Sequence, residues 1–182
     1  INNWWPPVLP KEIERTQEYV LAVGRLERGK GFDLLIESWK NIPSKLLIVG
    51  KGQEKNSLNQ LISNSGLDEK ITIVDEVSQK ELIQYYQRAS MLVVSSRNEG
   101  GPRVALEALY LKIPVISTDV GHMAEILPRE LVAEPNNLIA LTDLVEKYVG
   151  NTNYKQDSIF KYVAEEFSLS TKANQTLNIY KE

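Results

Sequence analysis

The sequence predicts a doubly wound α/β domain, Rossmann-like in class, built on a parallel β-sheet. Short, almost continuously apolar segments alternate along the chain with longer segments whose apolar residues recur with helical spacing. Strands this apolar are buried on both faces, which is typical of parallel sheets covered by helices on both sides. Most of the apolar segments end at a glycine or a carboxylate, as expected where a strand leaves the core and forms a site.

The alternating pattern starts at residue 19 and repeats along the chain. We expect strands at residues 19–24, 45–50, 70–77, 91–96 and 114–120. The intervening helices are expected at 32–42, around Leu58, Leu61 and Ile62, at 81–89, from Pro102, and at 122–127. After residue 135 the pattern becomes helical only, with expected helices at 137–149, 155–167 and 170–182.

The domain organisation follows from the same pattern. The length of 182 residues suits one domain with a good core. Residues 1–18 begin with a proline- and tryptophan-rich segment that reads as a linker, and residues 19–150 form the α/β domain. Residues 151–182 form terminal helices, the last with an apolar stripe made of Leu169, Ala173, Leu177 and Tyr180.

Composition excludes several classes of function. The net charge of −3 gives no basic surface for a nucleic acid, and no apolar run is long enough to span a membrane. The absence of cysteine excludes disulfides and thiolate metal sites, and the one histidine, His122, excludes a histidine-rich metal site. We interpret His122 as a local hydrogen-bonding or capping residue. The expected compartment is the reducing cytoplasm.

Candidate site residues gather where the predicted strands end. In a doubly wound sheet these ends share one edge, at which ligands bind. The residues at this edge are Gly24, Gly50, Gly52, Asp75, Glu99–Gly101 and Asp119–Gly121.

The segment Ser95–Ala108 combines a strand end, a glycine turn and a helix start. A proline is tolerated at the first position of a helix, where its missing N–H costs nothing. Free backbone N–H groups and the positive end of the helix dipole favour an anion such as a phosphate. The candidate phosphate-binding residues of this turn are Gly100, Gly101, Pro102, Arg103 and Val104.

A second cationic turn spans Gly24–Gly31. Its spacing matches most of a P-loop, but Gly31 replaces the serine or threonine that would hold magnesium, so we reject a nucleoside triphosphatase. What remains is two cations, Arg25 and Lys30, after a strand. They are either phosphate ligands or ordinary solvated cations, and we assign Arg28 to the second class.

Two carboxylates, Glu99 and Glu107, bracket the glycine turn. Glu107 has two interpretations: a solvated helix position paired weakly with Arg103, or a ligand-binding carboxylate that accepts hydrogen bonds from hydroxyls. Spacing alone favours the first interpretation.

The order of the motifs resembles that of a known family. The segments GRLERGKG, LLIVGKG, SSRNEGGPRVALEA and PVISTDVG occur in this order. Together they are similar to the donor-binding, C-terminal half of retaining GT-B glycosyltransferases of group 1, with its E-x7-E motif from Glu99 to Glu107. The resemblance covers nearly the whole chain, from the linker to the final helix.

The resemblance implies roles for individual residues. Arg25 and Lys30 would hold the diphosphate, Glu107 the ribose, and Glu99 would lie near the donor sugar. Glu99, Arg25 and Lys30 are thereby the candidate catalytic residues, although we assign no nucleophile. Cations and a helix N-terminus stabilise the leaving diphosphate, so no metal or other cofactor is expected.

The base is expected to stack near the turn Asp75–Val77, with Val77 as its contact and Gly24 and Gly50 at the neighbouring strand ends. Glycine is usual in the family where this chain has Asp75, and an apolar or aromatic residue is commoner than Gly101. These departures leave the preferences for base and sugar open.

The resemblance also implies what lies outside this sequence. The expected function is to bind a nucleotide-diphosphate sugar for retaining, hexosyltransferase-type transfer in carbohydrate or cell-surface polysaccharide biosynthesis. The acceptor would bind to a missing N-terminal domain, toward which residues 151–182 could pack and through which the protein could attach peripherally to the inner face of a membrane. The alternatives are a non-catalytic nucleotide-sugar-binding module or subunit, and an epimerase of similar architecture.

Overall fold

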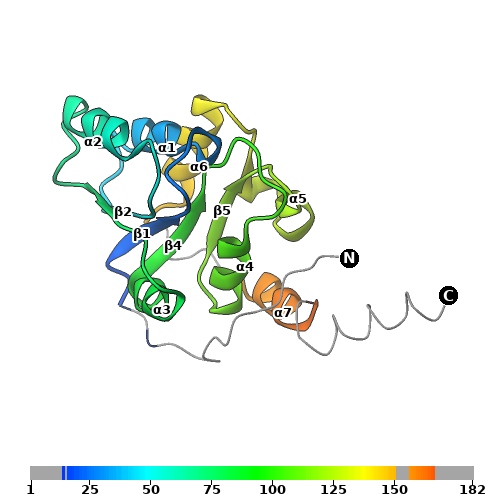
Figure 1. Cartoon of the computed structure of the whole chain (residues 1–182). Helices are drawn as coiled ribbons and strands as arrows, with labels where there is room; N and C mark the ends of the chain where they lie inside the picture. The colour runs from blue at the N-terminus through cyan, green and yellow to red at the C-terminus, as the bar shows by residue number, and fades with distance from the viewer. Residues whose placement is uncertain (1–13, 15, 151–155, 167–182) are drawn as a thin grey trace.

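Figure 1 shows the computed structural model, which describes residues 14, 16–150 and 156–166. Most of the linker expected at residues 1–18, and the final helix expected at 170–182 with its apolar stripe, lie outside these residues. Among the described helices, none has both the length and the apolar character needed to cross a bilayer.

The centre of the fold is a parallel sheet of six strands in the order β3-β2-β1-β4-β5-β6. The five expected strands are present, with boundaries shifted by a few residues. A sixth strand, β6, was not expected, because a two-residue strand has no readable periodicity. The strands are β1 (Tyr19–Val23), β2 (Leu46–Val49), β3 (Ile71–Val74), β4 (Ala89–Val94), β5 (Val115–Thr118) and β6 (Val132–Ala133).

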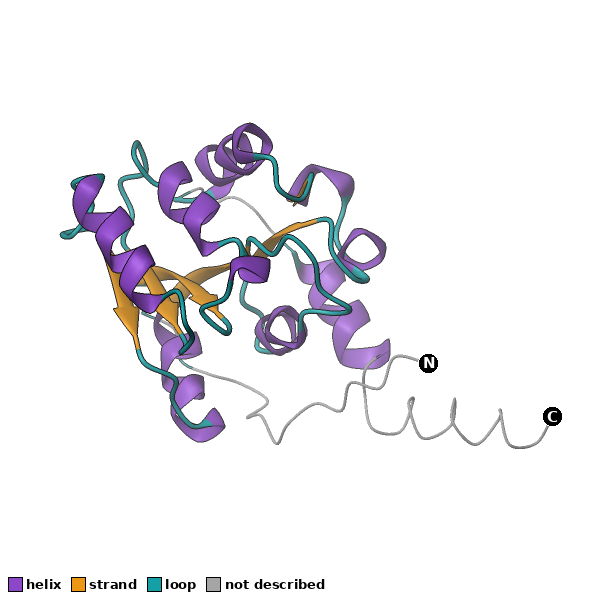
Figure 2. Ribbon diagram, turned by 45° about the horizontal axis from the view of Figure 1, so that its top comes forward, coloured by secondary structure: helices purple, strands orange, loops and turns teal. Residues whose placement is uncertain are grey.

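Helices cover both faces of this sheet, which confirms the doubly wound fold. Helices α1, α2 and α6 lie on one face and α3, α4 and α7 on the other (Figure 1), with the strands between them (Figure 2). The helices are α1 (Phe32–Ser38), α2 (Lys55–Asn64), α3 (Gln79–Arg88), α4 (Arg103–Tyr110), α5 (Met123–Ile126), α6 (Leu138–Tyr148) and α7 (Asp157–Glu166). Short 3₁₀ turns are η1 (Arg28–Lys30) and η2 (Arg129–Leu131).

The core is built from the apolar faces that the periodicity predicts. In α1, the side chains of Phe32, Leu35 and Ile36 are buried, and so is that of Trp39, the residue that caps the helix. The indole N–H of Trp39 donates to the carbonyl of Ser44 at 2.8 Å. Burial of side chains of this size stabilises the fold by about 1.5–3 kcal/mol each. In α2, Leu58 and Ile62 are buried, whereas Leu61 is only partly covered.

Helix α3 starts with a capping box. The hydroxyl of Ser78 accepts from the N–H of Glu81 at 3.3 Å, and the carboxylate of Glu81 accepts from the N–H of Ser78 at 2.9 Å. Two of the free N–H groups at the helix start are thereby satisfied. The cap fixes where α3 leaves the carboxyl edge of the sheet.

Helix α7 is joined to the sheet through Gln156, whose side chain is almost completely buried. Its amide accepts from the N–H of Val115 at 3.0 Å and donates to the carbonyl of Val115 at 2.9 Å, and α7 packs against α4. The part of residues 151–182 that is described thus belongs to the α/β domain. Contact between the remaining residues and another domain stays a prediction.

The direction of winding changes between β1 and β4, and the loops that leave these strands diverge there. The backbones come very close at this edge. A Cβ atom on Gly50 would lie 1.8 Å from the carbonyl oxygen of Gly24, and one on Gly31 would lie 2.1 Å from that of Ser95. Gly31 also has a positive φ of 63°. Glycine at these positions lets the loops pack closely enough to form one site.

We predict that Gly50→Ala lowers the free energy of unfolding by about 1–3 kcal/mol or more, because the β1 and β2 exits must separate. Gly29→Ala is the matched control, since a Cβ there would meet no atom within 4 Å, and we expect a change within about 0.5 kcal/mol. Urea unfolding of both variants tests this. Equal stability of the two variants would contradict the close backbone contact.

Candidate functional site

A cavity of about 520 Å³ opens at the carboxyl edge of the sheet, within the range of sites for small molecules. It lies where β1 and β4 diverge, as expected for a doubly wound fold. Ten of the sequence-predicted site residues line it: Gly24, Arg25, Lys30, Gly50, Val77, Glu99, Gly101, Arg103, Val104 and Glu107. Gly100 and Pro102 flank the lining residues along the chain, and the candidates Gly52, Asp75 and Asp119–Gly121 at the other strand ends do not line the cavity.

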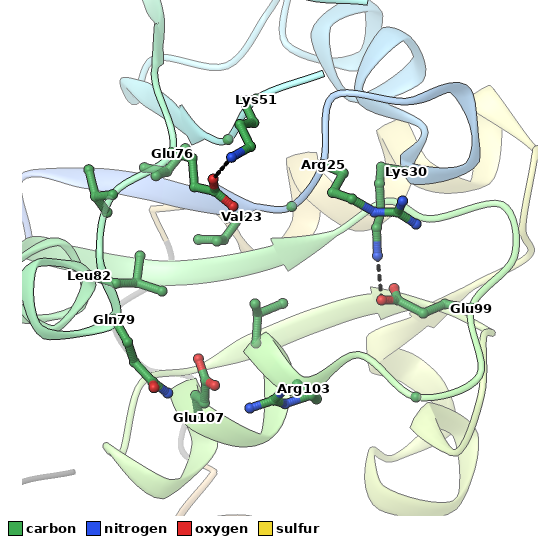
Figure 3. Close-up of a pocket in the computed structure, with 16 residues that line it drawn as sticks. Val23, Arg25, Lys30, Lys51, Glu76, Gln79, Leu82, Glu99, Arg103 and Glu107 are labelled. Atoms are coloured by element: carbon green, nitrogen blue, oxygen red, sulfur yellow. Dashed lines mark hydrogen bonds and ion pairs between the residues drawn. The ribbon is translucent and has the colours of Figure 1, made fainter. Parts of the chain in front are cut away.

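The two cations after β1 reach the cavity differently. Lys30, at the end of η1, is mostly buried, with a side-chain exposure of 20%, and forms an ion pair with Glu99 (Figure 3). Arg25 is 72% exposed and pairs with Glu27 at 3.0 Å. Arg28 is exposed and does not line the cavity, which agrees with its assignment as a solvated cation.

The ion pair between Lys30 and Glu99 neutralises the centre of the site. The hydroxyl of Ser96 donates to the second oxygen of Glu99 at 2.9 Å, so both carboxylate oxygens are engaged. An incoming phosphate would compete with Glu99 for the ammonium group of Lys30. Glu99 would then have an oxygen free to accept hydrogen bonds from hydroxyl groups.

Helix α4 begins one residue later than predicted. Pro102 is its N-cap, in an extended conformation, and Arg103 is the first helical residue. The N–H groups of Arg103 and Val104 belong to the first turn and therefore have no acceptor within the helix. Both residues line the cavity, so the positive end of the helix faces it.

Glu107 is buried, with an exposure of 5%, and its carboxylate points into the cavity (Figure 3). The hydroxyl of Tyr86 donates to its Oε2 at 3.0 Å. Burial raises the pKa of Glu107, while the hydrogen bond from Tyr86 and the charge of Arg103 oppose that rise. The interpretation of Glu107 as a solvated helix position is therefore wrong, because α4 is buried on the side that carries it.

The wall of the cavity around Val77 contains an ion pair at the rim. Lys51 and Glu76 form this pair (Figure 3), and both residues line the cavity. Just outside the lining, Asp75 pairs with Lys55 at 2.6 Å. Asp75, which stands where we expect a glycine, therefore places a charged pair beside the rim.

His122 lies beside the glycine turn and is exposed. Its Nδ1 is 3.3 Å from the carboxylate of Glu125, and its side chain makes no capping hydrogen bond to α5. A Cβ on Gly101 would lie 4.0 Å from the imidazole ring. The side chain therefore does not cap α5, and a local hydrogen-bonding role for His122 stays a prediction.

Arg97 clamps the loop after β4 onto the loop after β1. Its guanidinium forms two parallel hydrogen bonds with the carboxylate of Asp33, both of 2.7 Å, and also donates to the carbonyl of Arg28 at 2.8 Å and to Asn136 at 2.7 Å. The N–H of Arg97 donates to the carbonyl of Gly29 at 2.8 Å. Since Lys30 and Glu99 lie on these two loops, the clamp sets the distance between them.

The family can be identified by comparison with known proteins. The model of the family "Glycosyl transferases group 1" matches residues 10–166. The chain belongs to this family. The curated relatives include the amylovoran biosynthesis glycosyltransferase AmsD of Erwinia amylovora, 36% identical in an alignment of 149 residues that covers 74% of this chain and 42% of AmsD. They also include the O-antigen chain mannosyltransferase B of Escherichia coli, 26% identical over 96% of this chain and 49% of that enzyme.

Solved structures of glycosyltransferases share the fold. Sucrose-phosphate synthase of Thermosynechococcus elongatus superposes with a TM-score of 0.80 at 24% identity, over 98% of this chain and 49% of the synthase. The C-terminal domain of LpcC, a group 1 glycosyltransferase of Francisella tularensis, superposes with a TM-score of 0.75 at 22% identity, over 91% of this chain and 96% of that domain. The chain spans about half the length of the curated relatives it matches.

Several residues of this glycosyltransferase domain were missed by sequence reasoning. Lys51 lies between the glycines of the motif LLIVGKG, so the motif itself was a signal for it. Gln79 and Leu82 line the cavity from the start of α3, and Asp33, Arg97 and Tyr86 support it from outside. No local sequence pattern indicated these roles, because the bonds of Arg97 with Asp33 and of Tyr86 with Glu107, like the cavity itself, join segments far apart in the sequence.

Among the described residues, no group of three or more histidine, aspartate or glutamate side chains is arranged to hold a metal ion.

We predict that Asp33→Asn lowers the free energy of unfolding at pH 7 by about 1–2 kcal/mol, because a charge-assisted pair is lost. Burial alone would raise the pKa of Asp33, but the hydrogen bonds and charge of Arg97 lower it overall. A lowered pKa means that the pair adds stability above the unfolded-state pKa and loses it as the pH falls through the folded-state pKa.

The difference between wild type and Asp33→Asn should therefore shrink in acid, which urea unfolding at several pH values measures. Glu165→Gln is the control, since Glu165 belongs to an exposed ion pair with Lys161, and should change stability by at most about 0.5 kcal/mol. A difference between wild type and Asp33→Asn that does not vary with pH would contradict the clamp.

Proposed function

We propose that this chain is the donor-binding half of a glycosyltransferase and binds a nucleoside diphosphate sugar. The observation that carries the proposal is one cavity lined by a mostly buried lysine, a helix N-terminus and a buried carboxylate, provided by Lys30, α4 and Glu107. Cations and free N–H groups suit a diphosphate, and a carboxylate suits sugar hydroxyls.

The diphosphate is assigned to the part of the cavity lined by Lys30, Arg25 and the start of α4. Lys30 supplies a compact positive charge from a position of low exposure, where a charge interacts strongly. Arg25, whose exposed ion pair with Glu27 is weak, supplies a second cation. The first-turn N–H groups at Arg103 and Val104 complete the anion site.

Glu107 is assigned to the ribose and the wall around Val77 to the base. A buried carboxylate whose free oxygen faces a cavity is a suitable acceptor for two neighbouring hydroxyls. The rim pair of Lys51 and Glu76 offers both a donor and an acceptor for the edge of a base. This is the part of the site where base preference would be set.

The chemical step proposed is transfer of the sugar with retention of configuration. The bond from the anomeric carbon to the diphosphate oxygen breaks, a bond from that carbon to an acceptor hydroxyl oxygen forms, and the hydroxyl proton passes to the departing diphosphate. Negative charge grows on the departing oxygen as its bond breaks. Lys30, Arg25 and the start of α4 stabilise that charge from fixed positions, so the proposed reaction needs no metal ion. Glu99 lies close enough to Lys30 to contact the donor sugar beside the diphosphate.

The relatives support the substrate class and the division into two halves. One structural neighbour, HepE of Anabaena, was solved with UDP and glucose, and the curated relatives include enzymes of amylovoran and teichuronic acid biosynthesis. These named activities are transferases, which favours transfer over an epimerase reaction. We place the acceptor on a second, N-terminal domain, because the chain spans about half of these relatives.

We predict that the chain binds uridine or guanosine diphosphate in the presence of a chelator, as isothermal calorimetry would show. Because a charge-assisted contact contributes about 1.5–3 kcal/mol, Lys30→Ala should weaken binding roughly tenfold to a hundredfold, and Lys30→Ala with Arg25→Ala more. Arg28→Ala is the matched control: it removes a cation from the same loop that does not line the cavity.

Three results would contradict the proposal: binding of neither nucleotide, binding only when magnesium is added, or an equal loss of affinity in Arg28→Ala and Lys30→Ala.

A further inference from the structure

Tyr86 is a buried polar residue behind the cavity that the assignments above leave unused. It lies in the last turns of α3, has an exposure of 1%, and does not line the cavity. A phenylalanine would fill nearly the same space without bringing a hydroxyl into the core. A buried hydroxyl is costly unless it is hydrogen-bonded, so its bonding partner matters.

The hydroxyl of Tyr86 has two acceptors within reach on α4. The Oε2 of Glu107 is 3.0 Å away and the carbonyl oxygen of Val104 is 3.3 Å away. A phenol has a single hydrogen to donate, and a carboxylate accepts more strongly than a neutral carbonyl. The shorter contact, to Glu107, is therefore the principal bond.

The bond fixes one half of a carboxylate whose other half faces the site. Glu107 comes from α4 and Tyr86 from α3, so the contact ties together the two helices that form this wall. The Glu107 carboxylate points into the cavity (Figure 3). With one lone pair of Oε2 engaged by Tyr86, Oε1 and the remaining lone pair of Oε2 are left to accept hydrogen bonds from a ligand. A glutamate without such a partner could rotate about its side-chain bonds and lose this orientation.

We propose that Tyr86 is the positioning residue for ribose recognition: its hydroxyl orients the Glu107 carboxylate so that both ribose hydroxyls can be bound. This inference rests on the proposed function, because it requires that Glu107 contacts the ribose. It adds a residue that never touches the ligand yet determines selectivity between ribonucleotides and deoxyribonucleotides. A purely structural role for Tyr86 would change stability without changing that selectivity.

The test compares Tyr86→Phe with wild type for two ligands that differ in one hydroxyl. The ligands are uridine or guanosine diphosphate, whichever binds wild type more tightly, and its 2′-deoxy form, measured by calorimetry in a chelator. Wild type should prefer the ribonucleotide. In Tyr86→Phe the ribonucleotide affinity should fall about fivefold and the deoxyribonucleotide affinity much less, so the preference shrinks.

Tyr85→Phe is the matched control. Tyr85 is the neighbouring residue of α3 and lines a different cavity, with Tyr19 and Lys70. Removing its hydroxyl should leave the preference for the ribonucleotide unchanged. Glu107→Gln is the positive reference and should reduce the preference directly.

A double variant keeps the test valid if Tyr86→Phe folds poorly. Without the Tyr86 hydroxyl, a buried neutral amide costs less stability than a buried carboxylate, so Tyr86→Phe combined with Glu107→Gln is the better-tolerated change. If Tyr86 acts through Glu107, the double variant should show the same ligand preference as Glu107→Gln alone. A further loss of preference in the double variant would overturn the inference.

The outcomes also separate this inference from the proposed function. No nucleotide binding by wild type would overturn the proposed function and this inference with it. Binding by wild type with no ribose preference would overturn the ribose roles of Glu107 and Tyr86 but leave the diphosphate site. A ribose preference that is lost in Glu107→Gln but kept in Tyr86→Phe would overturn this inference alone.

Discussion

The change of winding direction between β1 and β4 is the constraint on which the rest of the site depends. It makes the two following loops diverge and opens a crevice at the carboxyl edge of the sheet. Glycines at 31 and 50 let the backbones approach, and the clamp of Arg97 on Asp33 then holds the loops together. The lysine of one loop thereby meets the glutamate of the other.

The glycines and the Arg97–Asp33 pair hold the site together, whereas the buried carboxylate of Glu107 destabilises the fold. Its burial raises its pKa, so its ionised form costs stability that the bond from Tyr86 only partly offsets. A domain that needed only a well-packed helix would use an apolar residue here, as α4 does at Ala105, Leu106, Ala108 and Leu109. Such a local conflict between stability and chemistry is typical of a binding site.

The sequence predicted the layers of the fold because buried parallel strands and amphipathic helices have distinct periods. It missed β6, which is too short to show a period. Helical spacing alone favoured a solvated face for Glu107, because spacing within one helix does not reveal what packs against it, and only the family resemblance indicated a ligand-binding role. The contacts of Arg97 with Asp33 and of Tyr86 with Glu107 join separate elements. Only the three-dimensional packing brings these pairs together.

The most direct test of the account is a crystal structure of the chain with uridine or guanosine diphosphate, grown in the presence of a chelator. The account predicts the diphosphate within hydrogen-bonding distance of the Lys30 ammonium and the first N–H groups of α4, with the ribose hydroxyls on Glu107. Nucleotide bound elsewhere, with Lys30 still paired to Glu99 and Glu107 uncontacted, would contradict it.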